Sequence, residues 1–63
     1  MLHIIKHEDG YMVKDNKKVL GYIKFVNLNG HPEAECDWVY SFDNDIWAVA
    51  YSFTEALEII KNH

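Results

Sequence analysis

The chain alternates between short hydrophobic runs and clusters of turn residues, a pattern typical of a small antiparallel sheet. The runs are rich in β-branched and aromatic residues, which favour strands. Asp, Asn and Gly separate them, as in hairpins. The pattern predicts strands over residues 2–6, 11–14, 19–26, 36–42 and 46–51. The turns between them are predicted at Asp9-Gly10, Asp15–Lys18, residues 27–35 and Asp43–Asp45. Within the third run, Gly21 indicates a bulge or a close contact on the backbone.

The last segment has the pattern of an amphipathic helix that begins after Ser52. Ser52 and Glu55 fit a capping box, in which the serine hydroxyl accepts the Glu55 amide proton and the Glu55 side chain reaches back. Apolar residues then follow at helical spacing: Phe53, Ala56, Leu57 and Ile60. A helix over residues 53–62 is too short to be stable alone, so we expect it to pack on the sheet.

These elements predict an α+β fold, a small antiparallel sheet of four to five strands with one C-terminal helix packed on one face. We expect residues 1–63 to form a single domain, because so short a chain buries only one small core. Trp38 and Ile60 are expected in that core. The second face of the sheet must then meet water or a partner.

The hairpin formed by residues 36–51 has two registers open to it. With a three-residue loop, the pairs are Phe42–Ile46, Tyr40–Ala48 and Trp38–Ala50. A four-residue loop reverses the parity, so that one strand exchanges its two sides. We favour the first register, because its inner face carries no charge and sets large residues opposite small ones as a floor for the helix. The outer face then holds Asp37, Val39, Ser41, Trp47, Val49 and Tyr51.

Four histidines, one cysteine and ten acidic residues raise the question of a metal site. His3 and His7 are about 13 Å apart on a strand, too far to share one ion. His31 and Cys36 supply only two ligands. The segment Asp43–Asp45 resembles the start of a calcium loop but lacks the glycine and the distal glutamate of such loops. We therefore expect no metal and no cofactor.

A catalytic site is not expected either. Acidic neighbours on both sides of Cys36 disfavour the thiolate that a nucleophile requires. The chain has no glycine-rich phosphate loop and no nucleophile elbow. It is also barely long enough to enclose a substrate pocket. The sequence thus predicts that the protein is not an enzyme.

Charge is divided unevenly along the chain. Residues 1–26 carry a net charge of +2 and residues 27–63 a net charge of −6, which sum to −4. The chain has six lysines and no arginine, the residue that pairs best with phosphate and guanine, which argues against nucleic acid as a partner. The single cysteine, together with the lack of a signal peptide and of a long apolar span, predicts a cytoplasmic protein without a membrane partner.

Two resemblances rest on these residues. A small sheet followed by the helical pattern Ser52-x-x-Glu55-Ala56 resembles the outline of integrase arm-binding domains, which implies DNA binding. The basic residues for that role would be Lys14, Lys17, Lys18 and Lys24. The acidic chain that ends in a strand and Ser52–Glu58 also resembles small phage and prophage proteins, some of which inhibit host enzymes such as RNA polymerase. This second resemblance implies a phage-like origin and an inhibitor role.

We predict a small acidic protein-binding module, encoded by a phage or mobile element, that inhibits or modulates a larger protein in the host cytoplasm. The expected binding residues are Trp47, Tyr51, Val49, Asp37, Asp43 and Asp45. They combine an aromatic centre with an acidic rim, for which a basic cleft is the natural complement. Two alternatives stay open. The lysines and the same aromatics could bind single-stranded nucleic acid, or the patch could be the seam of a homodimer.

Overall fold

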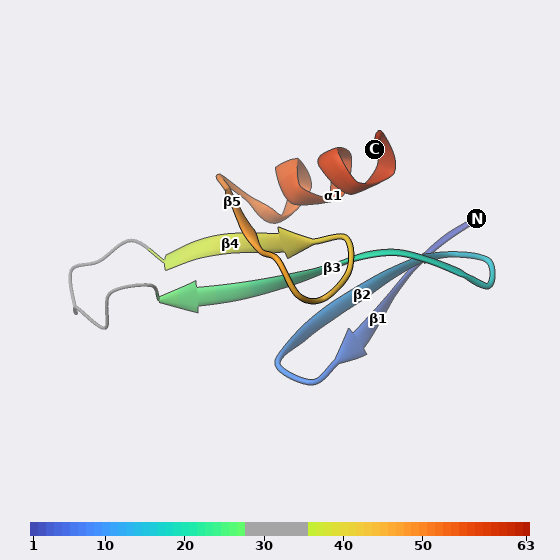
Figure 1. Cartoon of the computed structure of the whole chain (residues 1–63), viewed down its shortest axis with the longest axis horizontal. Helices are drawn as coiled ribbons and strands as arrows, with labels where there is room; N and C mark the ends of the chain where they lie inside the picture. Colours follow the sequence, from blue (N-terminus) through green and yellow to red (C-terminus); the bar gives the residue numbers. More distant parts are fainter. Residues whose placement is uncertain (28–35) are drawn as a thin grey trace.

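The computed structural model has the predicted α+β fold, a five-stranded antiparallel sheet with one helix packed against it (Figure 1). It describes residues 1–27 and 36–63, with the backbone alone at Asn27, Cys36 and Asp37. The elements are β1 (Leu2–His7), β2 (Gly10–Asp15), β3 (Lys18–Asn27), β4 (Cys36–Ser41), β5 (Ala48–Ala50) and α1 (Phe53–Lys61). Their order in the sheet is β1-β2-β3-β4-β5, so each strand pairs with its neighbours in sequence.

The first turn lies one residue earlier than predicted. His7 pairs with Gly10, which leaves Glu8 and Asp9 as the turn residues, and Glu8 takes the positive φ of 54°. Gly10 is instead the first residue of β2. A Cβ at Gly10 would lie 2.5 Å from the carbonyl oxygen of Ile23, so the glycine is required by the close approach of β3.

A bulge in β3 confirms the interpretation of Gly21. Val13 pairs with Gly21 but Lys14 pairs with Val19, so Leu20 is the extra residue of β3. Bulges sharpen the local twist of a strand. Here the bulge brings Leu20 into contact with the core.

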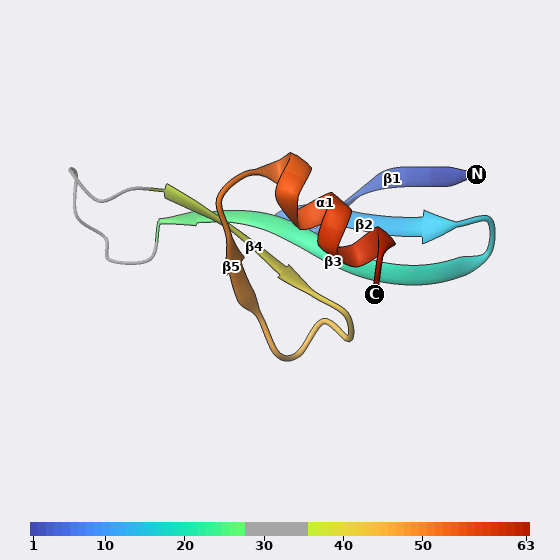
Figure 2. The same cartoon turned by 90° about the horizontal axis from the view of Figure 1, so that it is seen from above.

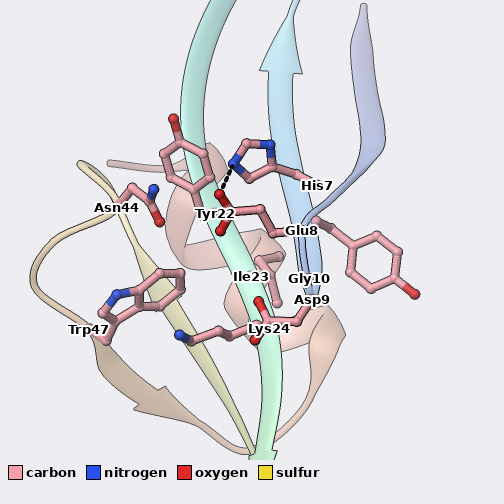
Figure 3. Close-up of a pocket in the computed structure, with 10 residues that line it drawn as sticks. His7, Glu8, Asp9, Gly10, Tyr22, Ile23, Lys24, Asn44 and Trp47 are labelled. Carbon is pink, nitrogen blue, oxygen red and sulfur yellow. Dashed lines mark ion pairs between the residues drawn. The ribbon is translucent and has the colours of Figure 1, made fainter.

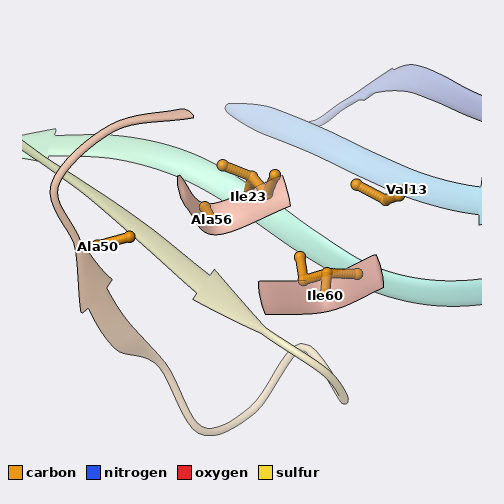
Figure 4. Packing of buried hydrophobic residues seen from close by; sticks show 5 residues of the cluster. All are labelled: Val13, Ile23, Ala50, Ala56 and Ile60. Atoms are coloured by element: carbon orange, nitrogen blue, oxygen red, sulfur yellow. The ribbon is translucent and has the colours of Figure 1, made fainter. Parts of the chain in front are cut away.

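The core lies between α1 and the sheet. Its buried members are Val13, Ile23, Ala50, Ala56 and Ile60 (Figure 4). Ile60 is buried as predicted and lies against Gly21, where a Cβ would be 3.0 Å from Ile60 Cδ1. Trp38 is half-buried beside this cluster, with its ring edge-on to Phe53 at 5.3 Å between centroids. The two residues that were expected in the core thus contribute to it to different extents.

The predicted helix begins at its expected N-cap. Ser52 Oγ accepts a hydrogen bond from the Glu55 amide at 3.1 Å. The Glu55 carboxylate does not reach the Ser52 amide as a full capping box requires. It accepts instead from the amide of Tyr51 at 3.5 Å, one residue earlier. The helix ends at Lys61, one residue before its predicted end, with Asn62 as its C-cap.

The hairpin of β4 and β5 has the register predicted for a three-residue loop. Trp38 pairs with Ala50 and Tyr40 with Ala48, and both large side chains pack against the core below α1. We call the side of the sheet that α1 covers the helix face and the other side the open face (Figure 2). The pairs place His7, Tyr22, Lys24, Val39 and Val49 on the open face.

The fifth strand is shorter than predicted, because only Ala48–Ala50 pair with β4. The amides of Asp45 and Ile46 donate hydrogen bonds to the Asp43 carboxylate, at 2.9 and 3.1 Å. A side chain that accepts backbone amides offers the chain an alternative to strand pairing. Ile46 and Trp47 therefore belong to the loop rather than to β5.

Candidate protein-binding surface

Trp47 lies over the open face of the sheet, at the end of the loop from β4 to β5 (Figure 3). The centroid of its ring is 4.4 Å from Lys24 Nζ, within the range of a cation–π contact. Val39, which pairs with Lys24 on this face, is only 5% exposed although α1 lies on the other side. Trp47 is thus half-buried and forms part of a second, thin layer on the sheet.

Three large side chains in or after the β4–β5 loop are strongly exposed. Tyr51 is 93% exposed, Ile46 is 75% exposed and Val49 is 56% exposed. Exposed apolar side chains of this size are typical of interaction sites. We call these three residues, together with Trp47, the hairpin patch. Because β5 is an edge of the sheet, the patch surrounds a free edge that a partner can reach.

Asp43 organises the loop that carries the patch. Its carboxylate accepts hydrogen bonds from the Ser41 hydroxyl at 3.0 Å and from the amides of Asp45 and Ile46. These bonds, with the Ile46 and Asp45 amides first and the Ser41 hydroxyl next, hold the pKa of the Asp43 carboxyl below its ordinary value of 3.8. The charged carboxylate therefore stabilises the conformation of the loop through these hydrogen bonds.

The other two acids predicted to bind a partner are Asp45 and Asp37, and the structure describes the side chain of Asp45 alone. Asp45 is exposed in the loop beside Ile46 and can contribute charge to a partner surface. Asp37 of β4 pairs with Val26 of β3 and lies two residues before Val39, so its backbone position faces the same side of the sheet as Val39. Its side chain is outside the described part of the chain. Val49, Tyr51 and Asp45 are therefore the predicted binding residues that the structure leaves most accessible.

Two members of the arrangement were not foreseen. Ile46 was expected in the last strand opposite Phe42, yet it lies in the loop, where it lines a groove with Tyr40 and Ala48. Its position directly after an Asp-Asn-Asp turn is the sequence signal for this. Lys24 was grouped with the other lysines, yet it lies against Trp47. No local pattern reports that contact, because the two residues are 23 positions apart in the sequence.

A small cleft on the open face separates Trp47 from the β1–β2 turn. Its polar lining includes His7, Glu8, Tyr22, Lys24 and Asn44 (Figure 3). His7 Nε2 lies 4.0 Å from Glu8 Oε1, and the His7 and Tyr22 rings are 5.5 Å apart. The cavity volume is about 30 Å³, enough for about two water molecules. This cleft cannot enclose a metabolite.

A wider groove lies beside the β4–β5 loop, where the sequence predicted a floor for the helix. It is lined by Tyr40, Phe42, Asp43, Ile46 and Ala48, and its volume is about 270 Å³. None of the residues that line it comes from α1, and Phe42 and Ile46 are 37% and 75% exposed. The His63 ring is stacked on Phe42 at this groove, with 3.9 Å between the ring centroids. Trp38 and Tyr40 of the expected floor pack against the core, while its loop end stays open.

The described residues contain no cluster of three or more His, Cys, Asp or Glu side chains arranged to hold a metal ion. His3 and His7 both lie on β1, as the strand pattern predicted. His31 and the Cys36 side chain lie outside the described part of the chain.

The lysines named for nucleic-acid binding do not form one cluster with Trp47. Lys17 lies in the β2–β3 turn and Lys18 opens β3. Six residues of strand, about 20 Å, separate Lys18 from Lys24 at the Trp47 contact. Lys14 lies on β2, where it pairs with Val19. Of these four lysines, Lys24 is the one whose contact with Trp47 is seen in the described part of the chain.

Comparisons with protein-family models, with curated proteins and with solved structures found no match. In the described part of the chain, no helix is long and apolar enough to cross a membrane.

Proposed function

We propose that the protein is a small binding module that docks on a larger protein through the hairpin patch. The observation that carries the proposal is the 93% exposure of Tyr51, directly after β5. Val49, on β5 at the edge of the sheet, is exposed as well. A tyrosine ring that is left in water can bury its whole apolar area when it enters a cleft, which makes it an effective anchor. The half-buried Trp47 gives the patch a fixed base.

The charge of the chain indicates the kind of partner. The net charge is −4, and residues 27–63 alone carry −6. Asp45 is exposed beside the patch. Acids at the rim of a contact mainly speed association with a basic surface and fix its orientation. We therefore propose an apolar cleft bordered by lysine or arginine side chains on the partner.

The finer proposal is that docking inhibits or modulates a host protein and that a phage or mobile element encodes the chain. Its support is the resemblance of residues 50–60 to small phage proteins. A chain of 63 residues with a cleft of about 30 Å³ can act on a large protein by occupying one of its surfaces. Occupation of a basic cleft would exclude the natural ligand of that cleft.

The test is capture from a host lysate by the immobilised full chain, with and without nuclease. Val49→Ala and Tyr51→Ala should each abolish capture of a specific protein, and nuclease should leave that capture unchanged. Val19→Ala is the matched control, because Val19 is also exposed (39%) but lies on β3 near the β2–β3 turn. Equal capture by Tyr51→Ala and the unmodified chain would refute the proposal.

A second candidate function, binding of single-stranded nucleic acid, is favoured by the contact of Lys24 with Trp47 beside Tyr22. Aromatic rings on an open sheet stack bases, and a lysine beside them can meet phosphate. In this case the protein should bind an oligonucleotide in a strongly salt-dependent manner, and Lys24→Gln should abolish this binding. Capture from the lysate would then disappear after nuclease treatment.

A further inference from the structure

The strand β1 is the second free edge of the sheet, opposite β5. It runs over six residues, Leu2–His7, and pairs with β2 without a register shift. Among the strands of residues 1–27 and 36–63, none pairs with its outer side. Such an edge offers a row of backbone donors and acceptors to another strand.

The pairing with β2 shows which peptide groups of β1 face outward. The Asn16 amide donates to the Met1 carbonyl at 3.2 Å, in line with the register that continues through β1. Hydrogen-bonded positions alternate in an antiparallel pair. The odd-numbered residues therefore bond to β2, and Leu2, Ile4 and Lys6 direct their N–H and C=O groups toward the free edge.

This edge carries little of the protection that edge strands usually have. It contains no proline and no bulge, and Lys6 is its only permanently charged residue. Ile4 and Ile5, which alternate between the two faces, are 44% and 45% exposed. Natural edge strands are normally short, charged or bulged, as the three-residue β5 illustrates. The length and the apolar exposure of β1 thus suit pairing with a strand of the same kind.

We propose that two copies of the chain associate through β1, antiparallel and about a two-fold axis at Ile4. Paired residues in antiparallel strands point to the same face, so a symmetric pairing must place one residue opposite itself. With Ile4 opposite Ile4 of the second copy, Leu2 meets Lys6 at both ends. All three outward-facing residues of each strand then bond, which gives about six hydrogen bonds.

The neighbouring registers are less favourable. An axis at Ile5 leaves Leu2 unpaired and sets His3 opposite His7 of the second copy, so about four hydrogen bonds remain. An axis at His3 leaves Lys6 unpaired to the same extent. With the axis at Ile4, His3 lies opposite Ile5 of the second copy, whereas both neighbouring registers set a histidine opposite a histidine.

The resulting dimer has one continuous ten-stranded sheet, with both copies of α1 on the same side. A contact along a single strand is smaller than the about 1,200 Å² of a standard stable interface, so we expect reversible dimers that grow with concentration. The hairpin patch lies on the opposite edge and stays free in both copies. The dimer is thus independent of the proposed function.

The first test is the mass of the full chain in solution by sedimentation between about 10 μM and 1 mM. The mass should rise from the 7.4 kDa of one chain toward twice that value. Ile4→Lys places two like charges face to face at the axis and should hold the mass at one chain over the whole range. Its circular dichroism should match that of the unmodified chain. Tyr51→Ala should dimerise normally.

The second test fixes the register by disulfide formation in a Cys36→Ser background. Ile4→Cys should form a covalent dimer on oxidation, because hydrogen-bonded partners have Cα atoms about 5.5 Å apart, within disulfide range. Ile5→Cys is the matched control: in this register the two copies of residue 5 are diagonal neighbours, about 8 Å apart, and should crosslink several-fold less. A monomer at every concentration would overturn the proposal, and so would equal or faster crosslinking of Ile5→Cys.

Discussion

At the scale of single residues, Asp43 shows how one side chain can set the position of a surface. Its carboxylate accepts two backbone amides and one hydroxyl, and the loop they define carries Ile46 and Trp47. The sequence suggested only an acid at the rim of a binding surface. The structure gives Asp43 a second role, because the amides of its own loop lie within reach.

These hydrogen bonds predict an acid-sensitive loop. Since the pKa of Asp43 is lowered below 3.8 in the folded protein, the charged carboxylate contributes stability above about pH 4. That contribution is lost as the pH falls through the lowered pKa. Asp43→Asn removes the titrating group, so thermal unfolding of this variant should change less between about pH 4 and pH 2 than that of the unmodified chain.

The matched control is Asp45→Asn, which changes the neighbouring acid and leaves the hydrogen bond from the Asp45 amide to Asp43 in place. It should retain the acid-induced loss of stability that Asp43→Asn removes. If both substitutions flatten the pH dependence equally, the hydrogen bonds of Asp43 are not its cause.

At the scale of elements, the N-terminus of α1 depends on one hydroxyl. Ser52→Ala removes the acceptor of the Glu55 amide and should cost about 1 kcal/mol of the free energy of unfolding. Thr54→Ala is the control. Thr54 is exposed in the first turn of α1, so this substitution also removes a hydroxyl, but not the one at the N-cap. Denaturant unfolding of both variants measures the difference between their free energies of unfolding. Equal values would mean that the Ser52 cap does not stabilise the protein.

The helix is held on the sheet chiefly by Ile60. Ile60→Ala removes a side chain that is 97% buried against Gly21 and the core, and should lower the free energy of unfolding by about 2–4 kcal/mol. Ile59→Ala makes the same chemical change at a half-buried neighbour and should cost clearly less. Equal losses in urea unfolding would mean that α1 packs through a different face.

At the scale of the whole molecule, the sheet has two free edges with different properties. The β1 edge offers a regular backbone and two isoleucines, whereas the β5 edge offers a short strand and the hairpin patch. With five strands, the two edges are about 19 Å apart. Val49 and Ile4 lie on these opposite edges, although Trp47 and His7 line one small cleft on the open face.

We therefore predict that the two edges act independently. Tyr51→Ala should lose capture of a larger protein and keep self-association, while Ile4→Lys should show the reverse. The double variant should lose both, with effects equal to the sum of the single ones. Sedimentation and capture assays on the same three proteins measure this. Loss of both activities in either single variant would indicate one shared surface, as in a homodimer sealed by the hairpin patch.

The sequence by itself determined the elements and most of their pairing. Period-two alternation, turn residues and the Ser52 cap act over a few positions, so local physics decides them. The same reasoning placed Gly21 at a bulge and chose the register of the last hairpin from the charge-free face of Tyr40 and Ala48. The first turn and the start of β5 shifted by one or two residues, because Gly10 and Asp43 make contacts that a local pattern does not report.

Only the tertiary structure decided which surfaces are covered. A helix of nine residues is about 14 Å long, and the groove lined by Tyr40, Phe42 and Ile46 stays open beside it. The twist of the sheet and the Asp43 loop bring Trp47 onto Lys24, across 23 positions of sequence. Tyr51 remains in water and β1 remains a free edge, because α1 covers neither of them. One short helix cannot cover five strands, and which parts stay exposed depends on its position in space rather than on any local sequence pattern.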